Sequence, residues 1–138
     1  MKLEEREQEI ISEFEMFDDW MEKYEYIIDI GKELAPLNEE HKVDENQIKG
    51  CQSQVWLYAF NKNGRIFFEA DSNALITKGL VALMVRVFSG SEPLEIINSK
   101  LEFLAKIGLQ EHLSPTRSNG LISMIKQMKN YAFALQSK

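Results

Sequence analysis

The chain has 138 residues and a formal net charge of −6, and 44% of its residues are apolar and 10% aromatic. These values predict one globular domain, residues 1–138, that buries about two-thirds of the surface of its unfolded chain. The acidic balance and the scattered Lys and Arg residues argue against nucleic acid as a partner. No apolar run approaches the roughly 20 residues that cross a bilayer, so we expect no membrane insertion.

Two further features bear on the compartment. The segment from Met1 to Glu7 is too acidic for a secretory signal or a transit peptide. The chain has a single cysteine, Cys51, so it cannot form an internal disulfide. Absence of disulfides is typical of a reducing compartment, and we therefore expect a cytoplasmic protein.

The first part of the chain predicts two helices. Apolar residues between Leu3 and Phe17 recur on one helical face. A second helix is expected to begin after Asp19, because Asp19 and Glu22 have the spacing of a capping box. It continues to Leu34, and Gly31 weakens it by roughly 1 kcal/mol relative to alanine, which is typical of a fraying end.

A β-hairpin is predicted after a long polar connection. Residues 35–49 are polar, and connections of this length are often functional or mobile. The runs 54–60 and 65–71 are rich in β-branched and aromatic residues, and the dipeptide Asn63-Gly64 between them favours a hairpin turn. Both faces of the first strand are apolar, which predicts that helices cover most of this small sheet. Three aromatic side chains are then expected in the core: Trp56, Tyr58 and Phe60.

The remainder of the chain predicts several helices. Asp71 or Ser72 is expected to cap a helix over 75–88, in which Gly79 allows close approach of another backbone. Short helices are expected from Pro93 and over 101–107, and a last helix begins within 114–118. The fold class predicted is therefore α+β, with a small antiparallel, hairpin-based β-sheet packed against several α-helices.

Cys51 is the main candidate for chemistry. It lies between the polar loop and the aromatic strand, directly after Gly50, whose backbone freedom suits a turn or a hinge. Lys49 and the amide of Gln52 are groups that could stabilise a thiolate. The alternative is that Cys51 is a small buried apolar residue, which is the usual role of a lone cysteine.

The histidines and Arg117 give weaker indications of a functional site. Cys51, His41 and His112 are too few to bind zinc or an iron–sulfur cluster without carboxylates, so we expect neither a metal nor a resident cofactor. Either histidine could act as a base for Cys51, although exposed surface histidines are the simpler interpretation. Arg117, in the first turn of the last helix, opposes the helix dipole, so we expect either an ion pair with a carboxylate or an anion site there.

The segment Gly50–Trp56 (GCQSQVW) resembles the SufE family of sulfur-acceptor proteins. Three further segments resemble the family in the same order: Trp20–Leu34, Asp71–Leu80 and His112–Leu121. Asn73 departs from the family pattern, because relatives often carry aspartate there.

The resemblance implies an α+β fold and two partners. A pyridoxal-phosphate cysteine desulfurase, SufS-like or CsdA-like, passes a persulfide sulfur to Cys51, and Cys51 delivers it to an iron–sulfur scaffold complex. Gly50, Gln52 and Arg117 are then expected in the loop or partner contacts. A lone thiol suits such a relay, because no neighbouring thiol can discharge the persulfide as a disulfide.

Other functions stay open. The chain could be a stand-alone cysteine-dependent redox or hydrolytic enzyme that uses His41 or His112. It could also be a non-catalytic interaction module in which Cys51 is inert. The sequence also leaves open whether the protein forms a homodimer.

Overall fold

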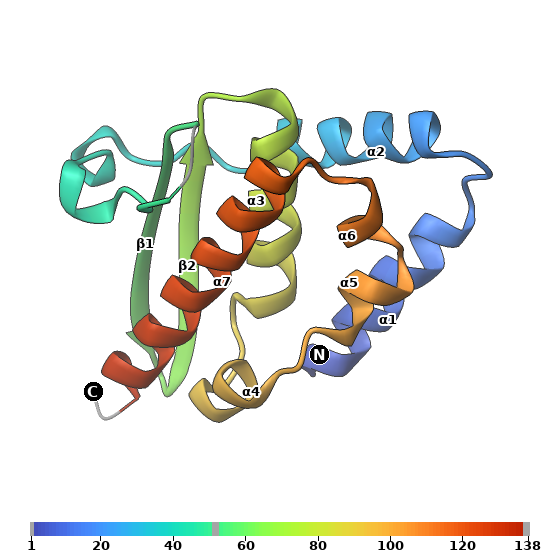
Figure 1. Cartoon of the computed structure of the whole chain (residues 1–138). Coiled ribbons are helices and arrows are strands. Elements are labelled where there is room, and N and C mark those ends of the chain that lie inside the picture. Colours follow the sequence, from blue (N-terminus) through green and yellow to red (C-terminus); the bar gives the residue numbers. More distant parts are fainter. Residues whose placement is uncertain (1, 51–52, 137–138) are drawn as a thin grey trace.

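The computed structural model describes residues 2–50 and 53–136, which form an antiparallel hairpin flanked by helices (Figure 1). The elements in chain order are α1 (Leu3–Glu15), α2 (Trp20–Lys32), the 3₁₀ turns η1 (Glu39–His41) and η2 (Asp44–Asn46), β1 (Val55–Lys62), β2 (Arg65–Ser72), α3 (Leu75–Phe88), α4 (Pro93–Asn98), α5 (Glu102–Lys106), α6 (Leu109–His112) and α7 (Pro115–Leu135). This architecture confirms the predicted α+β class.

The hairpin forms at the predicted turn. Lys62 pairs with Arg65, so Asn63 and Gly64 are the two central residues of the turn. Both have positive φ, 56° and 83°, which is the backbone conformation that a two-residue type I′ turn requires. The side chain of Asn61 accepts a hydrogen bond from the amide of Gly64 at 3.1 Å and closes the turn.

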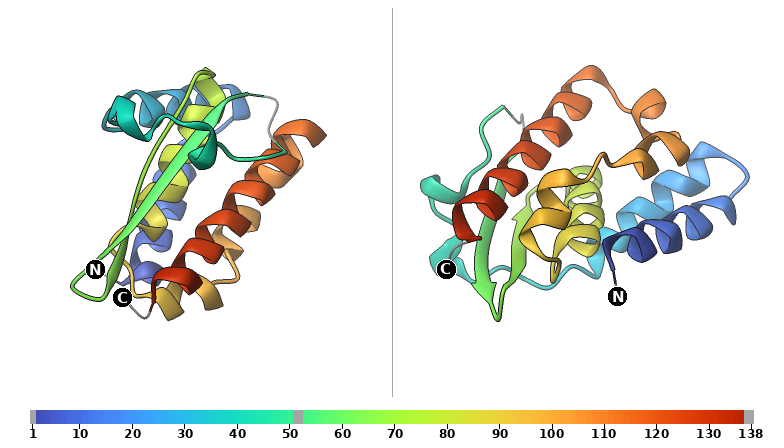
Figure 2. Two further views of the ribbon diagram at one scale, coloured as in Figure 1. Left: turned by 90° about the vertical axis from the view of Figure 1, so that its left-hand side faces the viewer. Right: turned by 90° about the horizontal axis from the view of Figure 1, so that it is seen from below.

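The two faces of the hairpin have different environments. The inner face is buried in the core shared with α3 and consists of Val55, Leu57, Ile66, Phe68 and Ala70. The outer face, with Trp56, Tyr58 and Phe60, is only half-buried. The turns η1 and η2 cross this outer face (Figure 2), and the ring of His41 stacks on Tyr58 with 3.7 Å between centroids. The predicted α-helices thus cover the inner face, whereas only the short 3₁₀ turns η1 and η2 cross the outer face. The assignment of the outer aromatic residues to the core is wrong, because they are only half-buried.

Helices α2 and α3 pack with their backbones in contact. A methyl group added at Gly79 would lie 2.2 Å from the carbonyl oxygen of Ile27, and one added at Gly31 would lie 2.8 Å from the amide nitrogen of Gly79. The close approach predicted for Gly79 is confirmed. Gly31 is the last but one residue of α2, so it does mark the end of this helix, but it is buried in the same contact and both glycines are required by packing.

Of the two helix caps predicted from the sequence, the one at α2 is correct and the one at α3 is wrong. Asp19 accepts a hydrogen bond from the amide of Glu22 at 2.9 Å, which confirms the predicted cap of α2. Ser114 caps α7 by accepting from the amide of Arg117 at 3.3 Å. The predicted cap of α3 is wrong, because Asp71 and Ser72 end β2 and the N-cap residue is Ala74.

Helix α7 lies beside the hairpin and α3 and packs on α4 as well (Figures 1 and 2). The hydroxyl of Tyr131 reaches the carbonyl of Leu57 at 3.5 Å, and the side-chain amide of Asn61 donates to the carbonyl of Leu135 at 2.8 Å. These contacts hold the last turns of α7 against β1, and its first turns line a pocket together with the start of β1. In the described part of the chain, no helix combines the length and apolar character needed to cross a membrane.

Candidate functional site

The predicted catalytic residue Cys51 and its neighbour Gln52 lie outside the described residues, whereas the chain on both sides of them is described. Upstream, the amide of Ile48 donates to the carbonyl of Val55 at 2.8 Å. Gly50 has a φ of +87°, and a methyl group there would lie 2.9 Å from Oγ of Ser123 in α7. The positive φ thus favours glycine at position 50, whereas the side chain of Ser123 could rotate away from an added methyl group.

The chain after Gln52 is held by the residues that follow β2. The amide of Gln54 donates to Oδ1 of Asn73 at 3.1 Å, and the side-chain amide of Asn73 donates to Oε1 of Gln54 at 3.2 Å. Oγ of Ser72 donates to the carbonyl of Gln54 at 2.8 Å. Asn73 therefore supports the loop through neutral hydrogen bonds.

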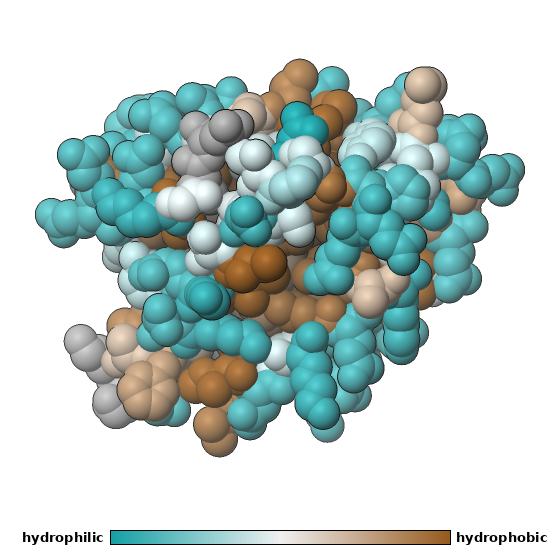
Figure 3. All heavy atoms as spheres, viewed as in Figure 1, coloured by the Kyte–Doolittle hydropathy of each residue, from teal (hydrophilic) through white to brown (hydrophobic). Residues whose placement is uncertain are grey.

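A pocket of about 240 Å³ opens beside these residues, between the start of β1, α3 and the first turns of α7. On the face that carries α7, apolar side chains reach the surface among polar ones (Figure 3). The floor of the pocket is apolar and its rim carries hydroxyl groups. The floor residues are Val55, Leu80, Val81, Leu121 and Met124, and the hydroxyl residues are Ser53, Thr77, Ser114 and Thr116.

Arg117 is the one charged residue among the described residues that line this pocket. Its side chain is exposed, and the described part of the chain offers it no ion pair. The predicted carboxylate partner is thus not found among the described residues. The guanidinium and the N-terminal end of the 21-residue helix α7 both place positive charge at the pocket, which favours an anion there.

The two histidines lie apart from each other. His41 stacks on Tyr58 over the outer face of the hairpin. The ring of His112 stacks on Trp20 with 4.0 Å between centroids, and its Nδ1 lies 3.0 Å from the carbonyl oxygen of Gly108. Neither histidine is among the described residues of the pocket.

The described residues contain no group of three or more His, Cys, Asp or Glu side chains arranged to hold a metal ion. Sequence reasoning missed the hydroxyl groups of the pocket rim, for example Thr77 and Thr116. These residues are far apart in the chain and have no local spacing that links them, so only the packing of α3 against α7 brings them together.

Two relatives of similar sequence are both named SufE-like. The chain is 42% identical over 132 residues to SufE-like protein 1 of Arabidopsis thaliana, a chloroplastic/mitochondrial protein, covering 95% of this chain but only 36% of that protein. It is 43% identical over 129 residues to an uncharacterized SufE-like protein of Rhizobium etli, covering 90% of this chain and 87% of that protein.

A hypothetical protein from Thermus thermophilus, whose solution structure is known, shares the fold. Its TM-score is 0.80 at 14% sequence identity, over 96% of this chain and 97% of that one. The family model described as "SufE: Fe-S metabolism associated domain" matches residues 8–132. This match, with relatives at about 40% identity, shows that the chain belongs to the SufE family, whose domain is associated with iron–sulfur metabolism.

Proposed function

We propose that this chain accepts a sulfur atom from a pyridoxal-phosphate cysteine desulfurase of the SufS or CsdA type and relays it to an iron–sulfur scaffold complex. Cys51 is the acceptor. The observation that carries the proposal is the position of the only cysteine in a SufE-family chain: it directly follows Gly50 and precedes Ser53, which lines the positively charged pocket. The reducing cytoplasm, where a free thiol persists, is the compartment that suits this chemistry.

The transfer is a thiol–disulfide-type exchange. The Cys51 thiolate attacks the outer sulfur of the desulfurase persulfide, and the bond between the two sulfurs of that persulfide breaks. The desulfurase thiolate leaves, and Cys51 becomes the persulfide. The second transfer repeats the exchange toward the scaffold, so the relay needs no external oxidant or reductant.

The chemistry of the pocket suits a persulfide. A persulfide at neutral pH is an anion with a large, polarizable sulfur, and the pocket combines a positive end, hydroxyl donors and an apolar floor. The apolar floor limits access of water and oxidants to the stored sulfur. We infer that the outer sulfur of the Cys51 persulfide occupies this pocket between the two transfers.

The decisive experiment is intact-mass analysis of the purified protein after incubation with a SufS-like desulfurase and cysteine. We expect the protein to gain the mass of one sulfur atom, about 32 Da, and to lose it on treatment with a thiol reductant. Omission of cysteine is the control. Wild-type protein that gains no sulfur would refute the relay.

Arg117 is expected to support the reaction rather than the fold. Replacing Arg117 by alanine should slow sulfur transfer about tenfold, because the positive charge that favours the thiolate and the persulfide anion is lost. The melting temperature should change by only a few degrees, because the guanidinium is exposed. Single-turnover transfer and thermal unfolding measure the two effects.

Two variants serve as controls for Arg117. Arg117→Lys keeps the positive charge and should retain most of the transfer rate. Lys126→Ala removes an exposed positive charge from the same helix outside the pocket and should leave transfer unchanged. If Arg117→Ala loses transfer only in proportion to its loss of thermal stability, its role is structural.

A further inference from the structure

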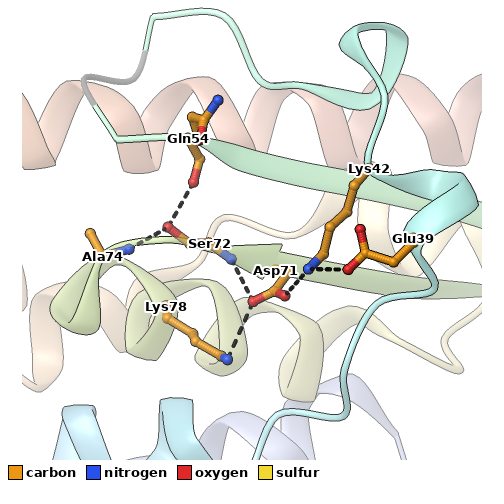
Figure 4. Close-up of polar contacts among 7 residues, drawn as sticks. All are labelled: Glu39, Lys42, Gln54, Asp71, Ser72, Ala74 and Lys78. Carbon is orange, nitrogen blue, oxygen red and sulfur yellow. Dashed lines mark hydrogen bonds and ion pairs between the residues drawn. The ribbon is translucent and has the colours of Figure 1, made fainter.

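Asp71 is a nearly buried carboxylate shared by two lysines. It lies at the end of β2 opposite Trp56, and the residue is 8% exposed. Its Oδ2 lies 3.1 Å from Nζ of Lys42, and its Oδ1 lies 3.3 Å from Nζ of Lys78 in α3. The amide of Ser72 also donates to Oδ1 at 2.8 Å (Figure 4).

Lys42 belongs to the chain that leads to Cys51. It follows η1, binds Oε1 of Glu39 at 3.3 Å, and its ammonium lies 5.8 Å from the ring centroid of Trp56. The ion pair with Asp71 therefore joins the segment over the outer face of the hairpin to β2. Lys78 joins the same carboxylate to the first turn of α3, whose next residues line the pocket.

The two residues after Asp71 hold the other side of Cys51. Ser72 and Asn73 bind Gln54 through the hydrogen bonds described above, and Oγ of Ser72 also accepts from the amide of Ala74 at 3.4 Å (Figure 4). Three consecutive residues thus contact the chain both before and after the proposed sulfur acceptor. The exchange of sulfur requires that the thiolate be aligned with the persulfide bond, so the position of this chain affects the rate.

We propose that Asp71 is a positioning residue for Cys51: by pairing with Lys42 and Lys78 at once, it holds the chain that leads to the thiol against β2 and α3. This proposal rests on the proposed function, in which Cys51 is the sulfur acceptor. Removal of the Asp71 carboxylate leaves the ammonium groups of Lys42 and Lys78 close together without the negative charge that attracts both. Their repulsion pushes Lys42, and the chain that carries it, away from α3.

The chemistry of Asp71 fits this role. Burial favours the neutral acid, but the amide of Ser72 and the two ammonium groups outweigh burial and hold the pKa of Asp71 below its usual range. The carboxylate therefore stays charged at neutral pH. The side chain of Asp71 is only 12% exposed, so salt screens these pairs less than it screens pairs on the open surface.

The first test uses the isolated protein and the neutral alkylating reagent iodoacetamide. Because the chain has one cysteine, the alkylation rate reports on Cys51 alone. Asp71→Asn should raise this rate roughly fivefold, as expected for the loss of an interaction of about 1 kcal/mol that orders the segment. Asp71→Glu keeps the charge and should restore most of the wild-type rate.

The matched control is Glu69→Gln. Glu69 lies two residues earlier on the same face of β2, is exposed, and forms no ion pair among the described residues. Its loss changes the net charge by the same amount without touching Lys42 or Lys78, so its alkylation rate should equal that of the wild type. Added NaCl should raise the wild-type rate only slightly, and it should lower the Asp71→Asn rate toward the wild-type value, because it screens the repulsion between Lys42 and Lys78.

The second test is single-turnover transfer from a persulfidated desulfurase. Asp71→Asn should lower the rate at saturating desulfurase about tenfold, with little change in the desulfurase concentration that gives half of that rate. Wild-type rates of both alkylation and transfer in Asp71→Asn would overturn the proposal, as would a lower melting temperature with unchanged alkylation. If wild-type protein accepts no sulfur, the relay fails, but the alkylation rates still decide the role of Asp71.

Discussion

Cys51→Ala should abolish sulfur acceptance completely while it leaves the fold and the binding of the desulfurase largely intact. The only thiol of the chain is removed, so no other side chain can take up the persulfide sulfur. The lost side chain is small, and its neighbours Gly50 and Ser53 keep their contacts with α7 and the pocket. Intact-mass analysis measures the acceptance, and thermal unfolding and desulfurase binding measure the rest.

Cys51→Ser is the matched variant, because it replaces only the sulfur atom. It should also gain no sulfur, and it should no longer stimulate the turnover of cysteine by the desulfurase. Stimulation equal to that of the wild type would contradict the relay and would favour an interaction module in which Cys51 is inert. Turnover of a thiol-reactive substrate by the isolated wild-type protein would instead favour a stand-alone enzyme.

Gly79→Ala should be the most destabilising of the substitutions considered. The new methyl group would lie 2.2 Å from the carbonyl oxygen of Ile27, which is backbone and cannot move aside without separating α2 from α3. We expect a loss of about 3 kcal/mol in the free energy of unfolding. This clash outweighs the gain of roughly 1 kcal/mol that alanine normally brings to a helix. Denaturant unfolding gives the change directly, and the melting temperature should fall by roughly 10 °C.

Gly64→Ala is the control for this substitution. A methyl group at Gly64 meets no atom within 4 Å, so its cost comes from the φ of +83° alone. That cost should be about 1 kcal/mol. A Gly79→Ala variant as stable as Gly64→Ala would show that α2 and α3 can separate at little cost, contrary to the packing argument.

The local structure followed from short stretches of sequence. The turn at Asn63-Gly64, the cap at Asp19 and the start of the last helix within 114–118 depend on hydrogen bonds and backbone angles within three or four residues, so sequence reasoning found them. The same local reasoning assigned Asp71 to a helix cap. Its partner Lys42 comes from a distant segment, and no local pattern indicates that pairing.

The candidate site also has features that follow from local sequence and features that do not. The GCQSQVW segment and the single cysteine are contiguous features, so they pointed to Cys51 and to the SufE family, and the match to the family model confirms the family. The assignment of Gly50, Gln52 and Arg117 to the site stays a prediction, although the structure places Arg117 at the pocket and Gly50 against α7. The single domain over residues 1–138 also stays a prediction.

By itself, the sequence determined the order of the two strands and the main helices, the fold class, the family and the residue that we propose as sulfur acceptor, because each depends on local patterns or on a contiguous motif. Only the tertiary structure decided that η1 and η2 cover the outer face of the hairpin, that α3 and α7 form a pocket, and that Asp71 joins Lys42 to Lys78. The physical reason is that these features arise where segments distant in the chain pack together. The free energy of such contacts depends on shape and charge in space rather than on spacing along the chain.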